Sequence, residues 1–289
     1  MRLRTIHVIA AAFLALLTPL YAQIPSTPAR IGYAPIDGLK MYYEIRGSGD
    51  PLVLIHGGVG GIAMFGNLPD TLARHRQVIA VELQGHGRTA DIDRPFSYEA
   101  MADDIVALLK YLGFPCSDVM GYSLGGEVAL QTAIRHPETV RKLILVSTTF
   151  SRNGWYPEVL AQFDQMGPSA GEGMKQSPLN QIYPNVNWVA LFTKLGDLER
   201  KPYDWSASVA SLKMSILLIF ADADAIRQEH IIEFYGLLGG GKRDAGLDGS
   251  RRAAAQLTVL PGATHYNITA SPILPDVVTN FLDGPPGAH

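Results

Sequence analysis

The 289-residue sequence contains one cysteine, Cys116, so no disulfide can form within the chain. Charged residues make up 18% of the chain and the formal net charge is −3, with no basic stripe and no long run of one charge. A nucleic acid is therefore not an expected partner. His, Cys and carboxylate residues do not cluster at metal-ligand spacing, so we expect neither a metal ion nor an organic cofactor.

Extended apolar runs are also scarce, and the most continuous one lies near the N-terminus. A basic start at Arg2 and Arg4 precedes an apolar segment at 6–17, and the small residue Ala22 follows it. This order is typical of a secretory signal peptide over 1–22, cleaved after Ala22. A membrane span needs about 20 apolar residues, so an uncleaved anchor is the weaker alternative. The sequence predicts an exported protein, periplasmic or secreted, with no stable membrane span after processing.

Apolar segments and amphipathic segments alternate along residues 23–289, which are numerous enough to bury one large core. Strands are predicted at 39–45, 51–55, 77–82, 117–120, 143–146, 216–220 and 256–260, and helices at 98–112, 126–133 and 273–282. Uniformly apolar strands such as 51–55 indicate a sheet covered on both faces. The alternation predicts an α/β fold with a mainly parallel sheet, whose ligands bind at the carboxyl ends of the strands.

The pattern changes between Thr149 and Leu212, where prolines and glycines interrupt it and all three tryptophans occur. This composition predicts short helices inserted between two strands, as a cap at about 150–212 within a single domain. A pocket needs apolar walls, so we expect Trp155, Trp188 and Trp205 to contribute to substrate binding. The alternative is that these side chains form the core of the cap.

Ser123 lies in the pentapeptide Gly121-Tyr122-Ser123-Leu124-Gly125, between a predicted strand and a predicted helix. This G-x-S-x-G context is that of a nucleophile elbow, which presents a serine hydroxyl on a sharp turn. Glycines on either side allow the strand and the helix to approach closely. The sequence therefore indicates Ser123 as a nucleophile.

A serine hydroxyl needs an adjacent base, and the base needs an orienting group. His265 follows the last predicted strand and is the predicted base. Asp222 and Asp224 both follow the strand at 216–220, and Asp224 is preferred because it leaves more loop to reach a histidine. The order Ser, Asp, His is the one expected for a nucleophile elbow of this type.

An oxyanion hole requires two backbone N–H groups. Leu124 supplies one because it follows the nucleophile, and Gly58 is the preferred second donor, with Val59 as the alternative. His56 and His86 are interpreted as residues that stabilise turns at strand ends.

Taken together, these segments resemble the α/β-hydrolase superfamily over about 36–282. The matching segments are His56-Gly57-Gly58, Gly85-His86-Gly87-Arg88, Gly121 to Gly126, Asp224 and Thr264-His265. The resemblance implies an eight-stranded sheet with a helical cap and a Ser-His-Asp hydrolase mechanism. A serine at the elbow argues against the haloalkane dehalogenase and epoxide hydrolase branches. Ala221 departs from the glycine often found before the acid loop.

Two other segments match ligand-binding patterns in outline. Gly58 to Ala63 imitates a dinucleotide fingerprint, but His56 interrupts the turn and no Tyr-x-x-x-Lys pair accompanies it. The segment 236–242 imitates a phosphate-binding loop, yet Arg243 stands where Ser or Thr must hold magnesium. The predicted function is hydrolysis of a small-molecule carboxylic ester through an acyl-enzyme. The alternatives are a lactonase or carbon–carbon bond hydrolase with the same triad, or a non-catalytic receptor on the same fold.

Overall fold

The computed structural model describes residues 30–284, so the predicted signal peptide at 1–22 lies outside the described residues. Within residues 30–284 one eight-stranded sheet has the order β1-β2-β4-β3-β5-β6-β7-β8. The strands are β1 (Arg30–Ile36), β2 (Leu39–Arg46), β3 (Pro51–Ile55), β4 (Gln77–Val81), β5 (Ser117–Tyr122), β6 (Val140–Val146), β7 (Ser215–Ala223) and β8 (Ala255–Thr264). β2 pairs antiparallel with β1 and β4, and the remaining pairs are parallel.

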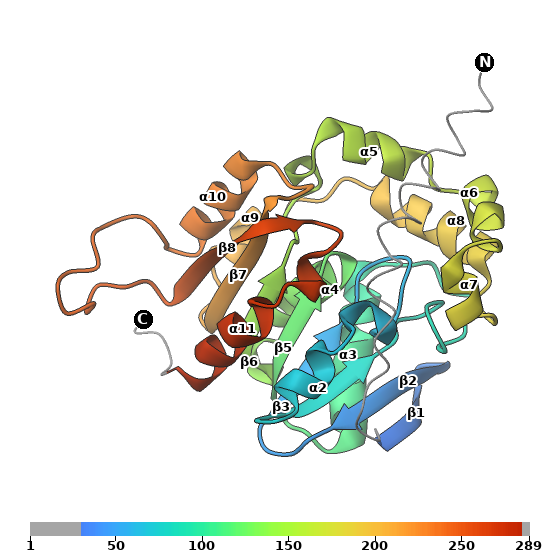
Figure 1. Ribbon diagram of the computed structural model, residues 1–289, viewed down its shortest axis with the longest axis horizontal. Helices are drawn as coiled ribbons and strands as arrows, with labels where there is room; N and C mark the ends of the chain where they lie inside the picture. Colours follow the sequence, from blue (N-terminus) through green and yellow to red (C-terminus); the bar gives the residue numbers. More distant parts are fainter. Residues whose placement is uncertain (1–29, 285–289) are drawn as a thin grey trace.

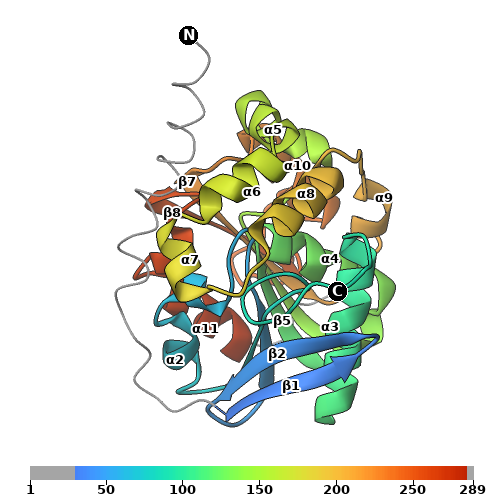
Figure 2. The same cartoon turned by 90° about the vertical axis from the view of Figure 1, so that its right-hand side faces the viewer.

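Helices cover both faces of the sheet, which explains the apolar strands. Successive strand side chains point to opposite faces, so Val53 and Ile55 join one buried cluster while Leu52 and Leu54 join the other. Figure 2 shows α2 and α11 on one side of the sheet and α3 and α4 on the other. These helices are α2 (Leu68–Leu72), α3 (Tyr98–Leu112), α4 (Leu124–Arg135) and α11 (Leu274–Asp283). Helix α10 (Gln228–Leu237) connects β7 to β8 along the chain.

Two strands differ from the sequence expectation. The sequence pattern predicts no strand over β1, because Gly32 and Pro35 interrupt it. β1 is an edge strand that pairs only with β2, and an edge position tolerates a proline. β8 continues four residues past the predicted end at Leu260, through Pro261 and Gly262, so that it ends immediately before His265.

A helical cap lies between β6 and β7, as predicted. Its elements are η3 (Arg152–Gly154), α5 (Pro157–Asp164), α6 (Pro168–Met174), α7 (Pro178–Ile182), α8 (Trp188–Glu199) and α9 (Ser206–Val209). Its buried side chains belong to the same cluster as those of α3 and α4, so the cap is packed onto the domain. Figure 1 shows α5 to α8 gathered at one end of the sheet, the end where β6 leads into the cap. No helix within 30–284 has the length and hydropathy of a membrane span.

Candidate active site

The predicted nucleophile Ser123 sits on a strained turn between β5 and α4. Its backbone angles are φ 53° and ψ −126°, which a non-glycine residue rarely adopts. Glycines on both sides are required by close backbone contacts. A Cβ atom on Gly121 would clash with the carbonyl oxygen of Gly125, and one on Gly125 would clash with that of Ile55. The turn therefore has the geometry of a nucleophile elbow.

Three residues from three loops form a continuous hydrogen-bonded chain. His265 Nε2 lies 3.1 Å from Ser123 Oγ, and His265 Nδ1 lies 3.0 Å from Asp224 Oδ1. The Asp224 and His265 side chains are 1% and 7% exposed. A carboxylate only accepts hydrogen bonds, so Nδ1 bears a proton, and in the neutral imidazole the Nε2 lone pair then faces the hydroxyl. The Tyr122 hydroxyl fixes the histidine loop by donating to the carbonyl of His265 at 2.7 Å.

The second carboxylate oxygen of Asp224 is held by groups that sequence reasoning missed. The Ser147 hydroxyl donates to Oδ2 at 2.5 Å, and the Ala221 N–H donates to it at 2.9 Å. Burial opposes ionisation of Asp224, but the hydrogen bond and charge of His265 and these two donors outweigh it. The pKa of Asp224 therefore lies below its ordinary value. Ser147 directly follows β6 and has φ 47°. Its position at the end of a strand beside β7 is the sequence feature that could have indicated its contact with Asp224.

Asp222, the alternative acid, has a different position. Its carboxylate accepts from the backbone N–H groups of Gly262 at 3.0 Å and Ala263 at 3.1 Å. The residue is exposed and lies at an irregularity in the pairing of β7 with β8. Asp222 thus ties the ends of these two strands together, while Asp224 meets His265.

The two predicted oxyanion donors lie side by side. A Cβ atom on Gly58 would be 3.8 Å from Leu124 Cβ, and one on Gly57 would be 3.3 Å from Ser123 Cβ. The N–H of Leu124 belongs to the first turn of α4, where backbone donors have no partner within the helix. Val59, the alternative donor, has φ 60°, so this loop is itself strained.

His56 and His86 are buried beside this loop. The N–H of Leu83 donates to His56 Nε2 at 3.1 Å, so Nδ1 bears the proton and donates to the Gly57 carbonyl at 2.7 Å. Burial lowers the pKa of His56 to about 3 and that of His86 to about 4. Both rings are therefore neutral at pH 7 and stabilise turns.

The three predicted pocket tryptophans occupy different surroundings. Trp155 packs edge-on against His265, with 5.2 Å between ring centroids. Trp188 is 2% exposed, and its indole N–H donates to Asn180 at 2.8 Å within the cap. Trp205 stacks on Tyr203 at 4.4 Å. Trp155 is the one that meets the triad, and the pocket roles of the other two stay predictions.

A pair of buried carboxyls, one in α4 and one in cap helix α8, was not predicted from the sequence pattern. Glu127 in α4 accepts from the N–H and the hydroxyl of Thr149, both at 3.1 Å. The Tyr98 hydroxyl donates to Glu199 in α8 at 3.4 Å. Burial raises the pKa of Glu127 to about 8, with a further contribution from Glu199, and burial raises that of Glu199 to about 7. The signal in the sequence was a glutamate within an otherwise apolar and small segment after the elbow.

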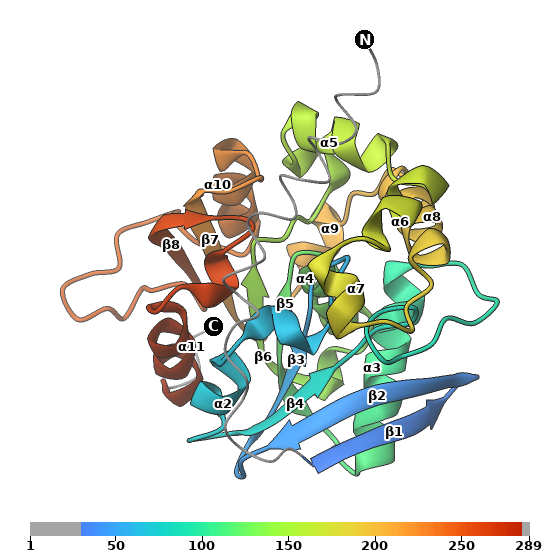
Figure 3. The same cartoon turned by 45° about the vertical axis from the view of Figure 1, so that its right-hand side comes forward.

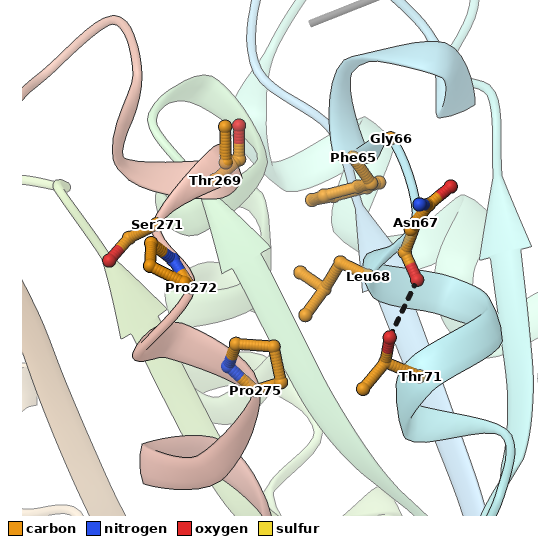
Figure 4. Close-up of a pocket in the computed structure, with 10 residues that line it drawn as sticks. Phe65, Gly66, Asn67, Leu68, Thr71, Thr269, Ser271, Pro272 and Pro275 are labelled. Carbon is orange, nitrogen blue, oxygen red and sulfur yellow. Dashed lines mark hydrogen bonds between the residues drawn. The ribbon is translucent and has the colours of Figure 1, made fainter. Parts of the chain in front are cut away.

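A surface cleft of about 340 Å³ lies between the α2 and α11 regions. Figure 4 shows Phe65 and Leu68 on one wall and Pro272 and Pro275 on the other. None of its ten lining residues has a titratable side chain, so this cleft offers no acid or base for proton transfer. Within 30–284 no three His, Cys, Asp or Glu side chains are arranged to hold a metal ion.

A family model described as the alpha/beta hydrolase fold matches residues 50–178, the part of the chain that contains the elbow. Solved structures of hydrolases match this fold over most of the chain. The chain therefore has the α/β-hydrolase fold.

Two curated proteins are similar to part of this chain. The 2-hydroxymuconate semialdehyde hydrolase of Pseudomonas sp. (strain CF600) is 35% identical over 116 residues, 38% of this chain and 41% of that protein. The pimeloyl-[acyl-carrier protein] methyl ester esterase of Nitrosospira multiformis is 35% identical over 122 residues, 40% of this chain and 46% of that protein. The chain thus spans less than half the length of these curated relatives.

A solved structure is similar to nearly the whole of this chain. Carboxylesterase CesB from Bacillus subtilis has a TM-score of 0.70 and 18% identity, covering 98% of this chain and 100% of that one. At this identity the likeness concerns the fold.

Proposed function

We propose that this α/β hydrolase cleaves a small-molecule carboxylic ester through an acyl-enzyme intermediate. The observation that supports the proposal is the chain of contacts from Ser123 Oγ through His265 to Asp224, at 3.1 and 3.0 Å. A neutral imidazole with its lone pair toward a serine hydroxyl is the arrangement that general-base catalysis needs.

In the proposed reaction, Ser123 Oγ attacks the ester carbonyl while His265 Nε2 takes the hydroxyl proton. Asp224 stabilises the resulting imidazolium from the Nδ1 side. The N–H groups of Leu124 and Gly58 would stabilise the oxyanion of the tetrahedral intermediate. His265 then donates its proton to the departing alcohol, and a water molecule activated by the same base releases the acyl group.

The test is hydrolysis of a panel of aryl esters with acyl chains of two to twelve carbons by the wild-type chain. The Ser123→Ala variant removes the nucleophile, so kcat should fall by about 10³-fold or more while the circular dichroism spectrum is unchanged. Ser211→Ala is a matched control, because its hydroxyl donates to a carbonyl at the protein surface. Near-normal turnover by Ser123→Ala would overturn the proposal.

A second candidate function is hydrolysis of a carbon–carbon bond, which the same triad can perform. It is favoured by the 35% identity to a protein named as a 2-hydroxymuconate semialdehyde hydrolase. Assaying a vinylogous 1,5-dicarbonyl compound beside the ester panel separates the two, because the specificity constant for the true class should be far higher. Binding of substrates from both classes without any turnover would instead support a non-catalytic receptor.

A further inference from the structure

Three parts of the chain meet at the carboxylate of Glu82, which directly follows β4: residues 62–63, the stretch 82–88 and Tyr183 of the cap. The side chain is 0% exposed. Its oxygens accept from the guanidinium of Arg88 at 2.8 Å, from the N–H of Arg88 at 2.5 Å and from the N–H of Ile62 at 3.3 Å. The hydroxyl of Tyr183, at the end of cap helix α7, also hydrogen-bonds to Glu82. Tyr183 in turn accepts from the N–H of Ala63 at 3.1 Å.

The segment 57–61 holds the predicted oxyanion donor and is anchored at both ends to the chain that follows β4. Upstream, His56 bridges the Gly57 carbonyl and the N–H of Leu83. Downstream, Ile62 donates to Glu82. Val59 has φ 60°, and such a conformation persists only where the surrounding structure holds it. The anchors are therefore what keep the loop in position.

The carboxylate of Glu82 is enclosed by backbone on two sides. A Cβ atom on Gly61 would lie 2.8 Å from Glu82 Oε1 and 2.6 Å from the Tyr183 hydroxyl oxygen. One on Gly87, where φ is 57°, would clash with Glu82 Oε2. The loop and the turn at 85–88 thus close on one carboxylate, which leaves it a single well-defined position. Figure 3 shows α7 of the cap next to the segment that leads into α2.

We propose that Glu82 and Tyr183 are positioning residues for the oxyanion loop, and that Tyr183 makes the geometry of the oxyanion hole depend on the docked cap. The inference rests on the proposed function. Tyr183 is the member of this network that comes from the cap, and its hydroxyl meets both Glu82 and the backbone of Ala63. Movement of α7 away from the domain removes both Tyr183 contacts at once and leaves the N–H of Ile62 to Glu82 as the remaining downstream anchor of the loop.

The test compares Tyr183→Phe with Tyr98→Phe. Tyr98 is a matched control because it also links domain and cap through a buried tyrosine–glutamate hydrogen bond, to Glu199, without touching the oxyanion loop. For Tyr183→Phe we expect kcat for an aryl ester to fall about 10-fold with KM within about twofold, since a displaced donor weakens stabilisation of the transition state. For Tyr98→Phe we expect kcat within about twofold of wild type.

A second readout reports on the oxyanion itself. A trifluoromethyl ketone forms a tetrahedral adduct with the serine, whereas the corresponding methyl ether analogue binds without reaction. Tyr183→Phe and Glu82→Gln should each raise the inhibition constant of the ketone about 10-fold and leave that of the ether unchanged. Both comparisons are made at a temperature where circular dichroism shows each variant folded.

The outcomes separate the two proposals. If wild type hydrolyses the ester but Tyr183→Phe and Glu82→Gln match Tyr98→Phe in kcat and in ketone inhibition, the positioning role is wrong and the proposed function stands. Equal weakening of ketone and ether would also overturn it, because the residues would then shape the pocket and not the oxyanion hole. If the wild-type chain turns over no substrate of the panel, the proposed function fails first.

Discussion

Replacing Asp224 by asparagine tests the triad through a change of one atom. Asp224 Oδ2 accepts from the hydroxyl of Ser147 and from the N–H of Ala221, while Oδ1 faces His265 Nδ1. A backbone N–H can only donate, so the position beside Ala221 requires an acceptor. The asparagine oxygen will occupy that position, and the amide nitrogen will face His265.

The amide N–H₂ in that orientation forces the imidazole into the other tautomer. Nδ1 then becomes the acceptor and Nε2 bears the proton, so Nε2 no longer takes the proton of Ser123. We expect kcat to fall by about 10²–10⁴-fold, with KM changed little. The opposite amide orientation would place a donor against the Ala221 N–H in a buried site, which costs about 1–3 kcal/mol.

Steady-state hydrolysis of an aryl acetate measures this effect, and Asp222→Asn is the matched control. Asp222 is exposed and its partners are backbone N–H groups of Gly262 and Ala263, for which water can substitute. We expect its kcat to remain within about fivefold of wild type. A larger loss for Asp222→Asn than for Asp224→Asn would refute the assignment of the acid.

The other predictions concern the cap and its contact with the domain. Among single alanine replacements of the three tryptophans, that of Trp155 should shift the acyl-chain profile in the ester panel, because Trp155 packs on His265. If all three variants are folded and keep the parental profile, the tryptophans form the core of the cap. The buried carboxyls Glu127 and Glu199, with pKa values of about 8 and about 7, keep protons that the unfolded chain releases above pH about 4.5. The free energy of unfolding should therefore fall as pH rises from about 5, up to about pH 7 for Glu199 and about pH 8 for Glu127, by up to about 1.4 kcal/mol per pH unit for each group. Urea unfolding measured at several pH values gives the free energy of unfolding as a function of pH. This pH dependence should be weaker for Glu127→Gln than for wild type, and an unchanged pH dependence would contradict the explanation.

Hydrophobic patterning along the chain is enough to predict most of the sheet. The central residues of strands β3 to β7 are apolar because helices cover both faces of the sheet, and that composition is visible locally. The edge strand β1 lacks the signal, because most of its residues are exposed and it includes Gly32 and Pro35. Local patterning thus predicts buried elements well and misses those that pairing alone stabilises.

The elbow and the order of Ser123, Asp224 and His265 follow from the sequence alone, because backbone sterics demand glycines at fixed spacing and each residue lies at a strand end. Which groups surround these residues depends on tertiary structure. Ser147 meets Asp224, and Tyr183 meets Glu82, only because parallel strands end at one edge and the cap folds over it. Contacts of this kind, including that of Tyr98 with Glu199, join residues 77 to 101 positions apart. A local sequence pattern does not predict such hydrogen bonds, because tertiary packing alone brings their two partners together.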